Sequence, residues 1–385
     1  MSGERIRTFN LMRQLAARGW RLSLFALAFG PPPAPGDLVR LEELCDDVLL
    51  EPFRPRPLAR YGRVLKNVLT ARPFQTEFFF DEAASAALER RLETSEHDLV
   101  IVGQLYMTPY LKADRRANAI LDAHNVELRR LESIAAAVPF SPRGLAARLQ
   151  CGPVRRLEAE VARSFARTLA VSPAERDYFE ALAPGTVDLV PNGVDCASFS
   201  PRAATPTTST LLFLGSMDYS ANVDAVGFLA REVLPHVRRR DARVTVIGSN
   251  PRPSALRAAR RAPLPVELLG FVGSTRPYFE AARAFVVPLR FGGGTRLKIL
   301  EALAYGVPVV TTSVGCEGLE LEHERDVLVA DHPRDFAGWI DRLLEDDELC
   351  ARLGANGRRT VERHYDWKAI GDRLDAALGK ALERR

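Results

Sequence analysis

A chain of 385 residues is long enough for two domains of ordinary size, each with its own hydrophobic core. Its 46% hydrophobic and 26% charged residues are normal for a globular protein, and a net charge of only +4 gives no reason to expect a nucleic-acid partner. Five scattered cysteines without a C-x-x-C pair argue against a disulfide framework or a zinc site, and the lack of a signal peptide or a long apolar run predicts a cytoplasmic protein that does not span a membrane.

The first expected element is an amphipathic helix that begins near Gly3 and ends at Gly19. Its apolar side is supplied by Ile6, Phe9, Leu11, Met12 and Leu15. Residues 20–28 then have the composition of a strand. A βαβ unit has a strand before such a helix, and none precedes this one. Two explanations remain open: the recorded start lies too far downstream, or the first strand is absent.

Residues 53–74 form a basic segment that contains six Lys or Arg residues and no acid. Its apolar residues fall on one helical face: Leu58, Tyr61, Leu65, Val68 and Leu69. A basic amphipathic helix of this kind can lie on an anionic membrane surface, which would make the protein peripheral on the inner face of the membrane. The alternative is an ordinary surface helix packed on the core. The sequence is equally consistent with both interpretations.

The remainder of the first half alternates short apolar strands with helices. Strands are predicted at 48–50, 98–102, 119–123, 168–171 and 187–190, and helices at 37–45 and 143–167. His124 follows one of these strands directly, at the edge of an open α/β sheet where ligand residues gather. Ser172, with Glu175 three residues later, predicts a capped helix start.

Residues 201–209 are rich in Pro, Thr, Ser and Ala and are the best candidate for a linker between domains. After them the alternation restarts, with strands predicted at 211–214, 244–247, 266–269, 284–289 and 307–311. Helices are predicted from about 222 to 237 and at 277–282, 334–344, 346–364 and 367–382. Strands that alternate with helices on both sides of the linker imply an α/β fold with two doubly wound parallel sheets.

The stretch from Ala284 to Thr312 carries the strongest functional signal. A buried strand leads into three glycines, which have no Cβ atoms and therefore allow backbone to approach a ligand closely. Thr295 can cap the following helix, whose free N–H groups and dipole favour an anion at its N-terminus. Two cationic side chains and a glutamate follow within the first turns. The predicted phosphate site consists of Gly292, Gly293, Gly294, Thr295, Arg296, Lys298 and Glu301.

A simpler interpretation of the same stretch stays open at this stage. The glycines would then form a tight turn, and Lys298 with Glu301 would be an exposed pair three residues apart on a helix. Such a pair stabilises a helix by a few tenths of a kcal/mol and has no ligand to bind. The phosphate site is the favoured hypothesis of the two.

Taken together, these motifs resemble family 4 of the glycosyltransferases, the retaining sugar transferases of GT-B fold. The resemblance covers nearly the whole chain and rests on segments that occur in the family's order: VSPAERDYF, VPNGVD, FLGSMDY, LLGFV, GGGTRLKILEALAYGVPVVTT and the HYDW helix. It implies two Rossmann-like domains across a cleft: an acceptor domain over 1–200, a nucleotide-sugar domain over 201–364, and a C-terminal helix over 365–385 that packs back on the first domain.

The resemblance also assigns donor contacts. Glu301 matches the glutamate that hydrogen-bonds the donor ribose, and Gly292 to Thr295 match the loop beside the diphosphate and sugar. Phe271 and Val272 lie where relatives recognise the base through backbone. The loop after the FLG strand, Gly215 and Ser216, lies beside the diphosphate.

Two departures from the family pattern bear on donor binding. Relatives commonly have a second glutamate eight positions before the first, where this chain has Gly293. They also often carry Arg and Lys after the FLG strand, where this chain has Ser216 and the pair Ala221–Asn222. We therefore expect Arg296 and Lys298 to supply the positive charge from the other side of the phosphates.

For the first domain, the resemblance aligns Gly3 with the end of a glycine loop that approaches the donor. The family's frequent sugar-contacting histidine has no match at Gly103–Gln104, which leaves His124 as the nearest substitute. Such a histidine is otherwise a hydrogen-bonded structural group, so a catalytic role for His124, alongside Glu301, is one of two alternatives. No Asp-x-Asp follows a strand, so neither a metal nor another cofactor is expected besides the nucleotide-diphosphate-sugar substrate.

The function expected from this resemblance is transfer of a sugar to a glycan or lipid-linked acceptor during synthesis of a cell-surface polysaccharide. Two other classes stay open, since fold does not fix chemistry. One is a nucleotide-sugar epimerase or phosphorylase on the same architecture. The other is a non-catalytic protein that binds nucleotide-sugar or glycan. A dehydrogenase is disfavoured because no G-x-G-x-x-G follows a strand.

Overall fold

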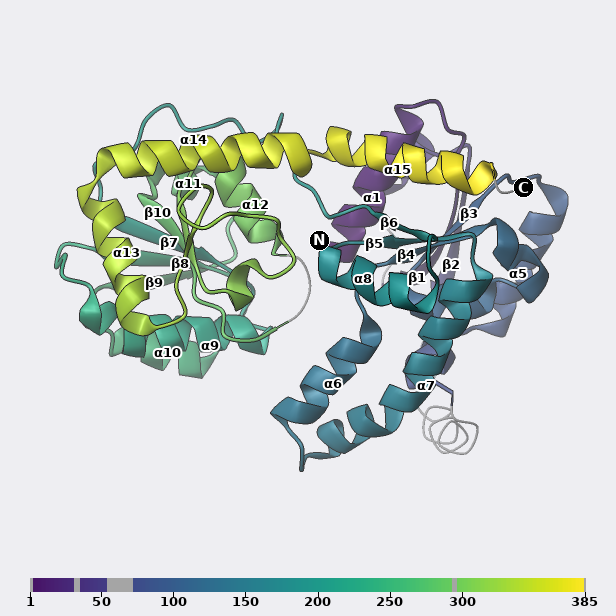
Figure 1. Cartoon of the computed structure of the whole chain (residues 1–385), viewed down its shortest axis with the longest axis horizontal. Helices are drawn as coiled ribbons and strands as arrows, with labels where there is room; N and C mark the ends of the chain where they lie inside the picture. Colours follow the sequence, from purple (N-terminus) through teal and green to yellow (C-terminus); the bar gives the residue numbers. More distant parts are fainter. Residues whose placement is uncertain (1–2, 31–34, 54–71, 293–295, 384–385) are drawn as a thin grey trace. The chain divides into compact units, whose positions relative to one another are not determined.

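The computed structural model describes residues 3–30, 35–53, 72–292 and 296–383 (Figure 1). The chain divides into two compact units. Unit 1 comprises Met1–Pro191 together with Gly371–Arg385, and unit 2 comprises Asn192–Ile370. The division thus falls at Pro191, ahead of the proline-rich segment that the sequence favoured as the linker. The predicted basic helix at 53–74 lies almost entirely outside the described residues.

Among the described residues of unit 2, six parallel strands form one sheet in the order β12-β11-β10-β7-β8-β9. Their bounds are β7 Thr210–Leu214, β8 Arg243–Ile247, β9 Val266–Gly270, β10 Ala284–Val287, β11 Val309–Thr311 and β12 Leu328–Val329. The chain enters at β7, moves outward to β9, returns to β10 beside β7, and then moves outward on the other side. This order is doubly wound, as predicted, and its switch point lies between β7 and β10.

Helices cover both faces of this sheet, with α9 and α10 on one side and α11, α12 and α14 on the other (Figure 1). Their bounds are α9 Ser220–Phe228, α10 Pro253–Arg260, α11 Arg276–Ala281, α12 Leu297–Ala304, α13 Pro333–Glu345 and α14 Asp347–His364. Short turns η3 Leu229–Val233 and η4 Leu234–His236 extend α9, and η5 Val314–Cys316 follows β11. Every residue of β10 is fully buried, which explains why its sequence is a continuous apolar run rather than an alternating one.

The described part of unit 1 contains parallel strands in two sheets rather than one. The strands β1 Ser23–Phe29 and β2 Asp47–Phe53 form a pair. The other sheet has the order β3-β4-β5-β6, with β3 Val100–Gly103, β4 Ala119–Ala123, β5 Arg167–Ala170 and β6 Val187–Leu189. All five residues of β4 are buried, whereas Ile101 on the edge strand β3 is exposed. The parallel α/β class predicted from the sequence is confirmed in both units.

The helices of unit 1 include the predicted N-terminal helix, α1 Gly3–Ala16, which is followed by Gly19 in a left-handed conformation with φ of 85°. The remaining elements are α2 Pro35–Glu42, α4 Phe74–Phe79, α5 Glu82–Thr94, η1 Leu105–Tyr110, η2 Ala113–Asn118, α6 Glu127–Ala137, α7 Pro142–Ser164 and α8 Pro173–Leu182. The helix α6 was not predicted. The capped start of α8 is confirmed, because the Ser172 side chain accepts a hydrogen bond from the Glu175 N–H.

The last helix, α15 Trp367–Leu382, begins in unit 2 and joins unit 1 from Gly371 onward. Its apolar face is buried: Ile370 and Leu374 have no exposed surface. In unit 1 the Trp20 indole N–H donates to Asp375 Oδ1 at 2.7 Å, and Arg18 donates to Asp372 at 2.5 Å. The end of the chain is thereby attached to the segment that follows α1.

Candidate functional site

The switch point of unit 2 brings two glycine-containing loops together at the carboxyl ends of β7 and β10. At one glycine of each loop, a Cβ would require a neighbouring side chain to move. A Cβ on Gly215 would lie 2.5 Å from the Asn222 side chain. A Cβ on Gly292 would lie 2.4 Å from the Tyr219 hydroxyl, and Gly292 also has φ of 124°. Close backbone approach is therefore required here, as expected for an anion-binding loop.

Lys298, on the first turn of α12, points back toward α9 and the end of β7. Its Nζ donates to Asn222 Oδ1 at 2.9 Å and lies 4.7 Å from the ring centroid of Phe213. Asn222 in turn donates to the Ser216 carbonyl at 2.8 Å. Burial, assisted by the nearby charge of Arg296, lowers the pKa of Lys298 to about 7. A buried lysine with this pKa is partly neutral near pH 7, and its neutral amine gains a proton when an anion binds beside it.

Arg296 occupies the N-cap position of α12 and is only 6% exposed. Its Nη2 donates to the Gly292 carbonyl at 2.8 Å, so the arginine closes the glycine loop on the helix start. Burial lowers its pKa, while Tyr219 and Glu317 act in the opposite direction. The predicted site residues Gly293, Gly294 and Thr295 lie outside the described residues, and the helix itself begins at Leu297.

Glu301 faces a different neighbour, the start of α11. The Thr275 hydroxyl donates to Glu301 Oε1 at 2.8 Å. Burial raises the pKa of Glu301, and the bond from Thr275 partly offsets that rise. Lys298 and Glu301 therefore bond to different partners, and both side chains are largely buried. The alternative in which they form an exposed helical pair is wrong.

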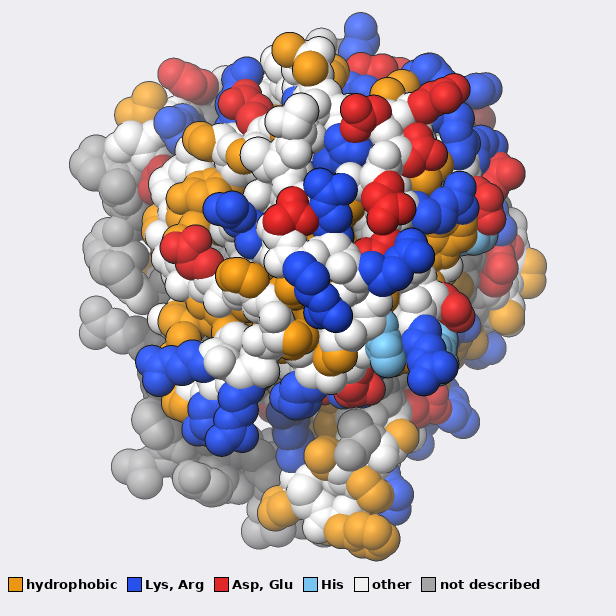
Figure 2. All heavy atoms as spheres, turned by 90° about the vertical axis from the view of Figure 1, so that its left-hand side faces the viewer, with side chains coloured by type: hydrophobic (Ala, Val, Ile, Leu, Met, Phe, Trp, Pro, Cys, Tyr) orange, Lys and Arg blue, Asp and Glu red, His pale blue; other side chains and the backbone are white. Residues whose placement is uncertain are grey.

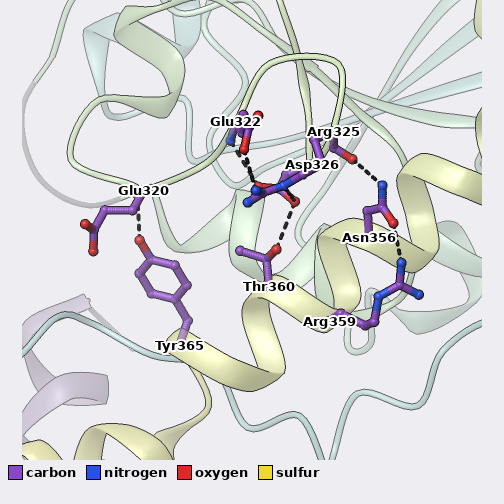
Figure 3. A network of polar contacts seen from close by, with 8 residues as sticks. All are labelled: Glu320, Glu322, Arg325, Asp326, Asn356, Arg359, Thr360 and Tyr365. Carbon is purple, nitrogen blue, oxygen red and sulfur yellow. Dashed lines mark hydrogen bonds and ion pairs between the residues drawn. The ribbon is translucent and has the colours of Figure 1, made fainter.

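A polar network fixes the loop that follows η5 (Figure 3). Asp326 accepts from the Thr360 hydroxyl at 2.8 Å and from the Glu322 N–H at 3.0 Å. The Glu320 N–H donates to the Tyr365 hydroxyl at 2.7 Å, and Asn356 donates to the Arg325 carbonyl at 3.0 Å. These bonds join the loop to α14 and its C-cap. The same loop begins at Glu317, whose charge acts on Arg296.

The remaining predicted residues of unit 2 lie on neighbouring loops. Ser216 exchanges a hydrogen bond with Ser249 at 3.0 Å and contacts Asp218 at 3.2 Å, which ties the loops after β7 and β8 together. Phe271 and Val272 follow β9, and the Phe271 ring is 84% exposed. Thr275, four residues further on, is the link from this loop to Glu301.

The two predicted residues of unit 1 are Gly3 and His124. Gly3 is the first residue of α1. His124 follows β4, and its Nε2 lies 3.0 Å from Asp122 Oδ2. Asp122 also accepts from Arg7 of α1, whose Nη2 lies 2.6 Å from Oδ1, and Arg7 donates to the Pro191 carbonyl at 3.0 Å. The structure therefore supplies a buried Arg7–Asp122–His124 row that the sequence did not predict.

Electrostatics keep the Asp122 carboxylate charged. Although burial alone raises the pKa of Asp122, the charges of Arg7 and His124 hold it well below its usual range. The other ring nitrogen of His124, Nδ1, is buried and has no hydrogen-bond partner among the described residues. Because Asp122 binds Nε2, the imidazole orientation is fixed and Nδ1 is the atom left to contact a ligand.

Unit 1 also contains a cavity of about 180 Å³ between α4, η1, α6 and α7. Its polar lining includes Gln75, Tyr106, Arg130 and Gln150, while Ile134 supplies part of an apolar wall. Arg130 donates to Glu127 at 2.6 Å and to Gln75 at 3.0 Å. The cavity thus presents hydrogen-bonding groups beside aliphatic surface. In the described part of the chain no group of three or more His, Cys, Asp or Glu side chains is arranged to hold a metal.

Two families of known proteins match this chain. Residues 2–198 match the family described as Glycosyltransferase Family 4, and residues 208–346 match Glycosyl transferases group 1. The first match alone spans more than half of the chain. Its range falls largely in unit 1, and the second range lies within unit 2.

Curated relatives are transferases of sugars. A GDP-mannose-dependent monoacylated alpha-(1-6)-phosphatidylinositol monomannoside mannosyltransferase of Corynebacterium glutamicum is 28% identical over 215 residues, which cover 50% of this chain and 56% of that protein. A D-inositol 3-phosphate glycosyltransferase of Paenarthrobacter aurescens is 30% identical over 235 residues, covering 52% and 55%. The chain spans about half the length of these relatives.

Solved structures match over nearly the whole chain. Sucrose-phosphate synthase from Thermosynechococcus elongatus has a TM-score of 0.70 and 18% identity, covering 98% of this chain and 92% of that one. HepE of Anabaena, solved with UDP and glucose, has a TM-score of 0.64 and 15% identity, covering 98% and 96%. At these identities the likeness concerns the fold.

Proposed function

Since this chain belongs to glycosyltransferase family 4, we propose that it transfers a sugar from a nucleotide-diphosphate-sugar donor to a glycan or glycolipid acceptor of the cell surface. The observation that carries the proposal is the cationic start of α12 at the β7–β10 switch point. There Arg296 and Lys298 are both largely buried, and glycine backbone takes the place of side chains. One relative, named as a GDP-mannose-dependent phosphatidylinositol monomannoside mannosyltransferase, supports the substrate classes.

The chemistry follows from the charge that develops during the reaction. When the bond between sugar and diphosphate breaks, negative charge accumulates on the leaving phosphate. Arg296 and Lys298, together with the free N–H groups at the start of α12, stabilise that charge, and Lys298 does so most strongly after taking up a proton. Retention of the anomeric configuration is part of the proposal and rests on the family resemblance alone.

Glu301 is proposed to bind the donor ribose. Its carboxylate is positioned by Thr275, and one oxygen remains to accept from a hydroxyl of the ligand. Burial beneath the loop after β9 would make such a bond strong. Phe271, Val272, Gly215 and Ser216 are proposed to line the same donor site from the loops after β9 and β7.

In unit 1, His124 is proposed to contact the sugar or the acceptor through Nδ1. The support is the orientation imposed by Asp122 and the missing partner at Nδ1 among the described residues. The cavity lined by Tyr106, Arg130 and Gln150 is proposed to take part of the acceptor, because it combines donors, acceptors and aliphatic surface. Gly3 is proposed to contribute backbone to the donor site.

An acceptor linked to a membrane lipid requires the enzyme to work at the membrane surface. We propose that the enzyme works on the cytoplasmic face of the membrane as a peripheral protein, with the basic segment 53–74 as one contact; this segment lies almost wholly outside the described residues. Among the described helices, none combines the length and the apolar composition needed to cross a bilayer.

The proposal is tested by following release of nucleoside diphosphate. Thermal-shift screening first identifies the nucleotide-sugar that stabilises the protein, since binding stabilises by RT ln(1 + [L]/Kd). Release that occurs only when a glycan or glycolipid acceptor is added supports transfer. Binding without turnover under all acceptors would instead favour a non-catalytic nucleotide-sugar-binding protein, and product with altered sugar stereochemistry but no acceptor would favour an epimerase.

A further inference from the structure

The hairpin formed by α6 and α7 ends in apolar side chains that face solvent. Figure 1 shows both helices extending away from the sheet of unit 1. Phe140, in the turn between them, is 99% exposed. Leu145 and Leu149, four residues apart on α7, are 57% and 55% exposed, and Val138 before the turn is also exposed. Figure 2 shows hydrophobic side chains gathered at the lower end of the molecule, where this hairpin ends.

The turn that presents Phe140 is well defined. The Ser141 side chain accepts from the Gly144 N–H at 3.0 Å and donates to the Val138 carbonyl at 2.9 Å, which caps α7 and joins it to the end of α6. A Cβ on Gly144 would lie only 1.9 Å from the Val138 carbonyl oxygen, so only glycine permits this packing. The exposed phenylalanine therefore sits on a capped, closely packed turn rather than on a frayed end.

The same segment is uniformly basic. Between Glu132 and Glu158 the sequence contains no acid and four arginines: Arg143, Arg148, Arg155 and Arg156. Arg143 and Arg148 are exposed, and no described carboxylate lies within ion-pair distance of either. An exposed apolar end flanked by arginines complements a surface with negative charge above an apolar interior, which is the composition of an anionic bilayer.

Self-association through this surface is disfavoured by the same charges. A symmetric dimer formed by the hairpin ends would bring the arginines of two copies together without a described acid between them. The hairpin also lies close to the unit 1 cavity, because Ile134 and Arg143 line that cavity and are within about one helical turn of the connecting residues. A membrane contact here would place the cavity near the lipid headgroups.

We propose that the end of the α6–α7 hairpin docks unit 1 on an anionic lipid bilayer. Phe140, Leu145 and Leu149 enter the boundary between headgroups and acyl chains, while Arg143 and Arg148 contact lipid phosphates. This docking rests on the proposed transferase function and deepens it. The docked hairpin brings a lipid-linked acceptor to the cavity of unit 1. This membrane-binding surface of the protein is distinct from segment 53–74.

Vesicle co-sedimentation of the full chain tests the docking. We expect the protein to bind vesicles that contain about one third phosphatidylglycerol, to bind neutral phosphatidylcholine vesicles far less, and to be released by salt. Phe140→Asp should reduce partitioning at least about ten-fold, and Arg143→Gln or Arg148→Gln about five-fold each. Val39→Asp is the matched control, because Val39 is an exposed apolar residue on α2 of unit 1 and should leave binding unchanged.

Tryptophan fluorescence tests whether the hairpin itself enters the lipid. Phe140→Trp should show a blue-shifted emission on adding anionic vesicles, after subtraction of the native tryptophan signal, whereas Val39→Trp should not shift. Because Phe140 is fully exposed and Val39 is half exposed, both substitutions should leave the folded structure intact, as far-ultraviolet circular dichroism can check.

The proposal is overturned if Phe140→Asp binds anionic vesicles as well as the native protein, which would assign any binding to segment 53–74. It is also overturned if light scattering shows a dimer that Phe140→Asp dissociates while vesicles are not bound. Release of nucleoside diphosphate with a short, soluble acceptor separates the two proposals. Phe140-dependent vesicle binding without such release contradicts the proposed transferase activity alone, and release without vesicle binding contradicts the docking alone.

Discussion

Lys298 is the residue whose chemistry depends most on the site around it. An ordinary lysine titrates near 10.5, whereas burial brings the pKa of Lys298 to about 7. Its Nζ keeps a hydrogen bond to Asn222 and contact with the Phe213 ring. A folded protein that has to hold this ammonium is destabilised relative to one with an apolar side chain, which is typical of residues retained for ligand binding.

We predict that Lys298→Met makes the ligand-free protein more stable by about 1–2 kcal/mol at pH 7 and weakens nucleotide-sugar binding at least about ten-fold. The unfolded chain binds more protons than the folded one between pH 7 and 10.5, so the native protein gains stability from this group as pH rises through that window. The stabilisation by Lys298→Met should accordingly be largest at pH 7 and below and fade towards pH 10.5. Denaturant titrations at several pH values check this, and a variant that is uniformly less stable contradicts it.

Glu301 gives a second prediction at this scale. Glu301→Gln removes the charge that a donor hydroxyl would meet, so donor affinity should fall roughly ten-fold, the usual loss for a hydrogen bond to a charged group. Thr275→Val should have a smaller effect, since it only releases the positioning bond to Oε1. Glu280→Gln, on the exposed side of α11, is the matched control. Thermal shift with the identified nucleotide-sugar measures all three; equal shifts for Glu301→Gln and Glu280→Gln would remove Glu301 from the donor site.

At the scale of elements, the loop between β10 and α12 depends on glycine. Gly292→Ala should distort this loop, because φ of 124° is strained for any residue with a Cβ and the Tyr219 hydroxyl, 2.4 Å from that Cβ, would have to move. We expect a loss of about 1–3 kcal/mol in stability together with loss of donor binding. Gly338→Ala in α13 is the contrasting control: a Cβ there meets nothing within 4 Å and should be neutral or slightly stabilising. If both variants behave alike in urea and in donor binding, the strained-loop account fails.

The link between α1 and β4 gives a prediction for unit 1. Asp122→Asn removes the carboxylate charge that the buried Arg7 guanidinium contacts at 2.6 Å, and breaking such a pair costs about 3–5 kcal/mol. Arg7→Met combined with Asp122→Asn should recover part of that loss, because the buried positive charge is removed together with its carboxylate partner. Hydrogen exchange of β4 amides measures the local effect. A double variant that is less stable than Asp122→Asn alone would show that charge burial is not the cause.

Elements with a clear local sequence pattern were predicted, whereas α6, which lacks one, was not. The strand β10 and the helix α12 stand out in sequence because one is a continuous apolar run and the other has a regular apolar period. The helix α6 begins at Glu127, and its N-cap residue Val126 has no side chain that can cap it, so the usual start signal is missing. Thr295 was expected to cap α12, yet the helix begins at Leu297 with Arg296 in the N-cap position.

The candidate site was predicted only in part, for a related reason. Glycines and charges that lie close together in sequence, such as Gly292 and Arg296, were found from local pattern. Their partners come from distant segments: Asn222 lies 76 residues from Lys298, and Asp122 lies 115 residues from Arg7. No local spacing shows which side chains a doubly wound sheet brings to its switch point. Strand order is the missing information, and it appears only in the folded chain.

For the whole molecule, the resemblance to glycosyltransferase family 4 was carried by several short motifs in a fixed order, and the family matches over 2–198 and 208–346 confirm it. The parallel α/β class is confirmed in each unit. Sugar, base and acceptor do not follow from these matches, because the contacts proposed for the base are made by backbone and Gly293 replaces a side chain that relatives commonly use.

The central claim is that a diphosphate binds at the start of α12 and that Lys298 takes up a proton from solution as it binds. Calorimetric titration of UDP and GDP into the native protein and Lys298→Met at pH 7, in two buffers of different ionisation enthalpy, tests it most directly. We predict net uptake of about half a proton by the native protein, from a pKa of about 7, and weaker binding without uptake by Lys298→Met. Equal affinity and equal proton uptake for the two proteins would contradict the claim.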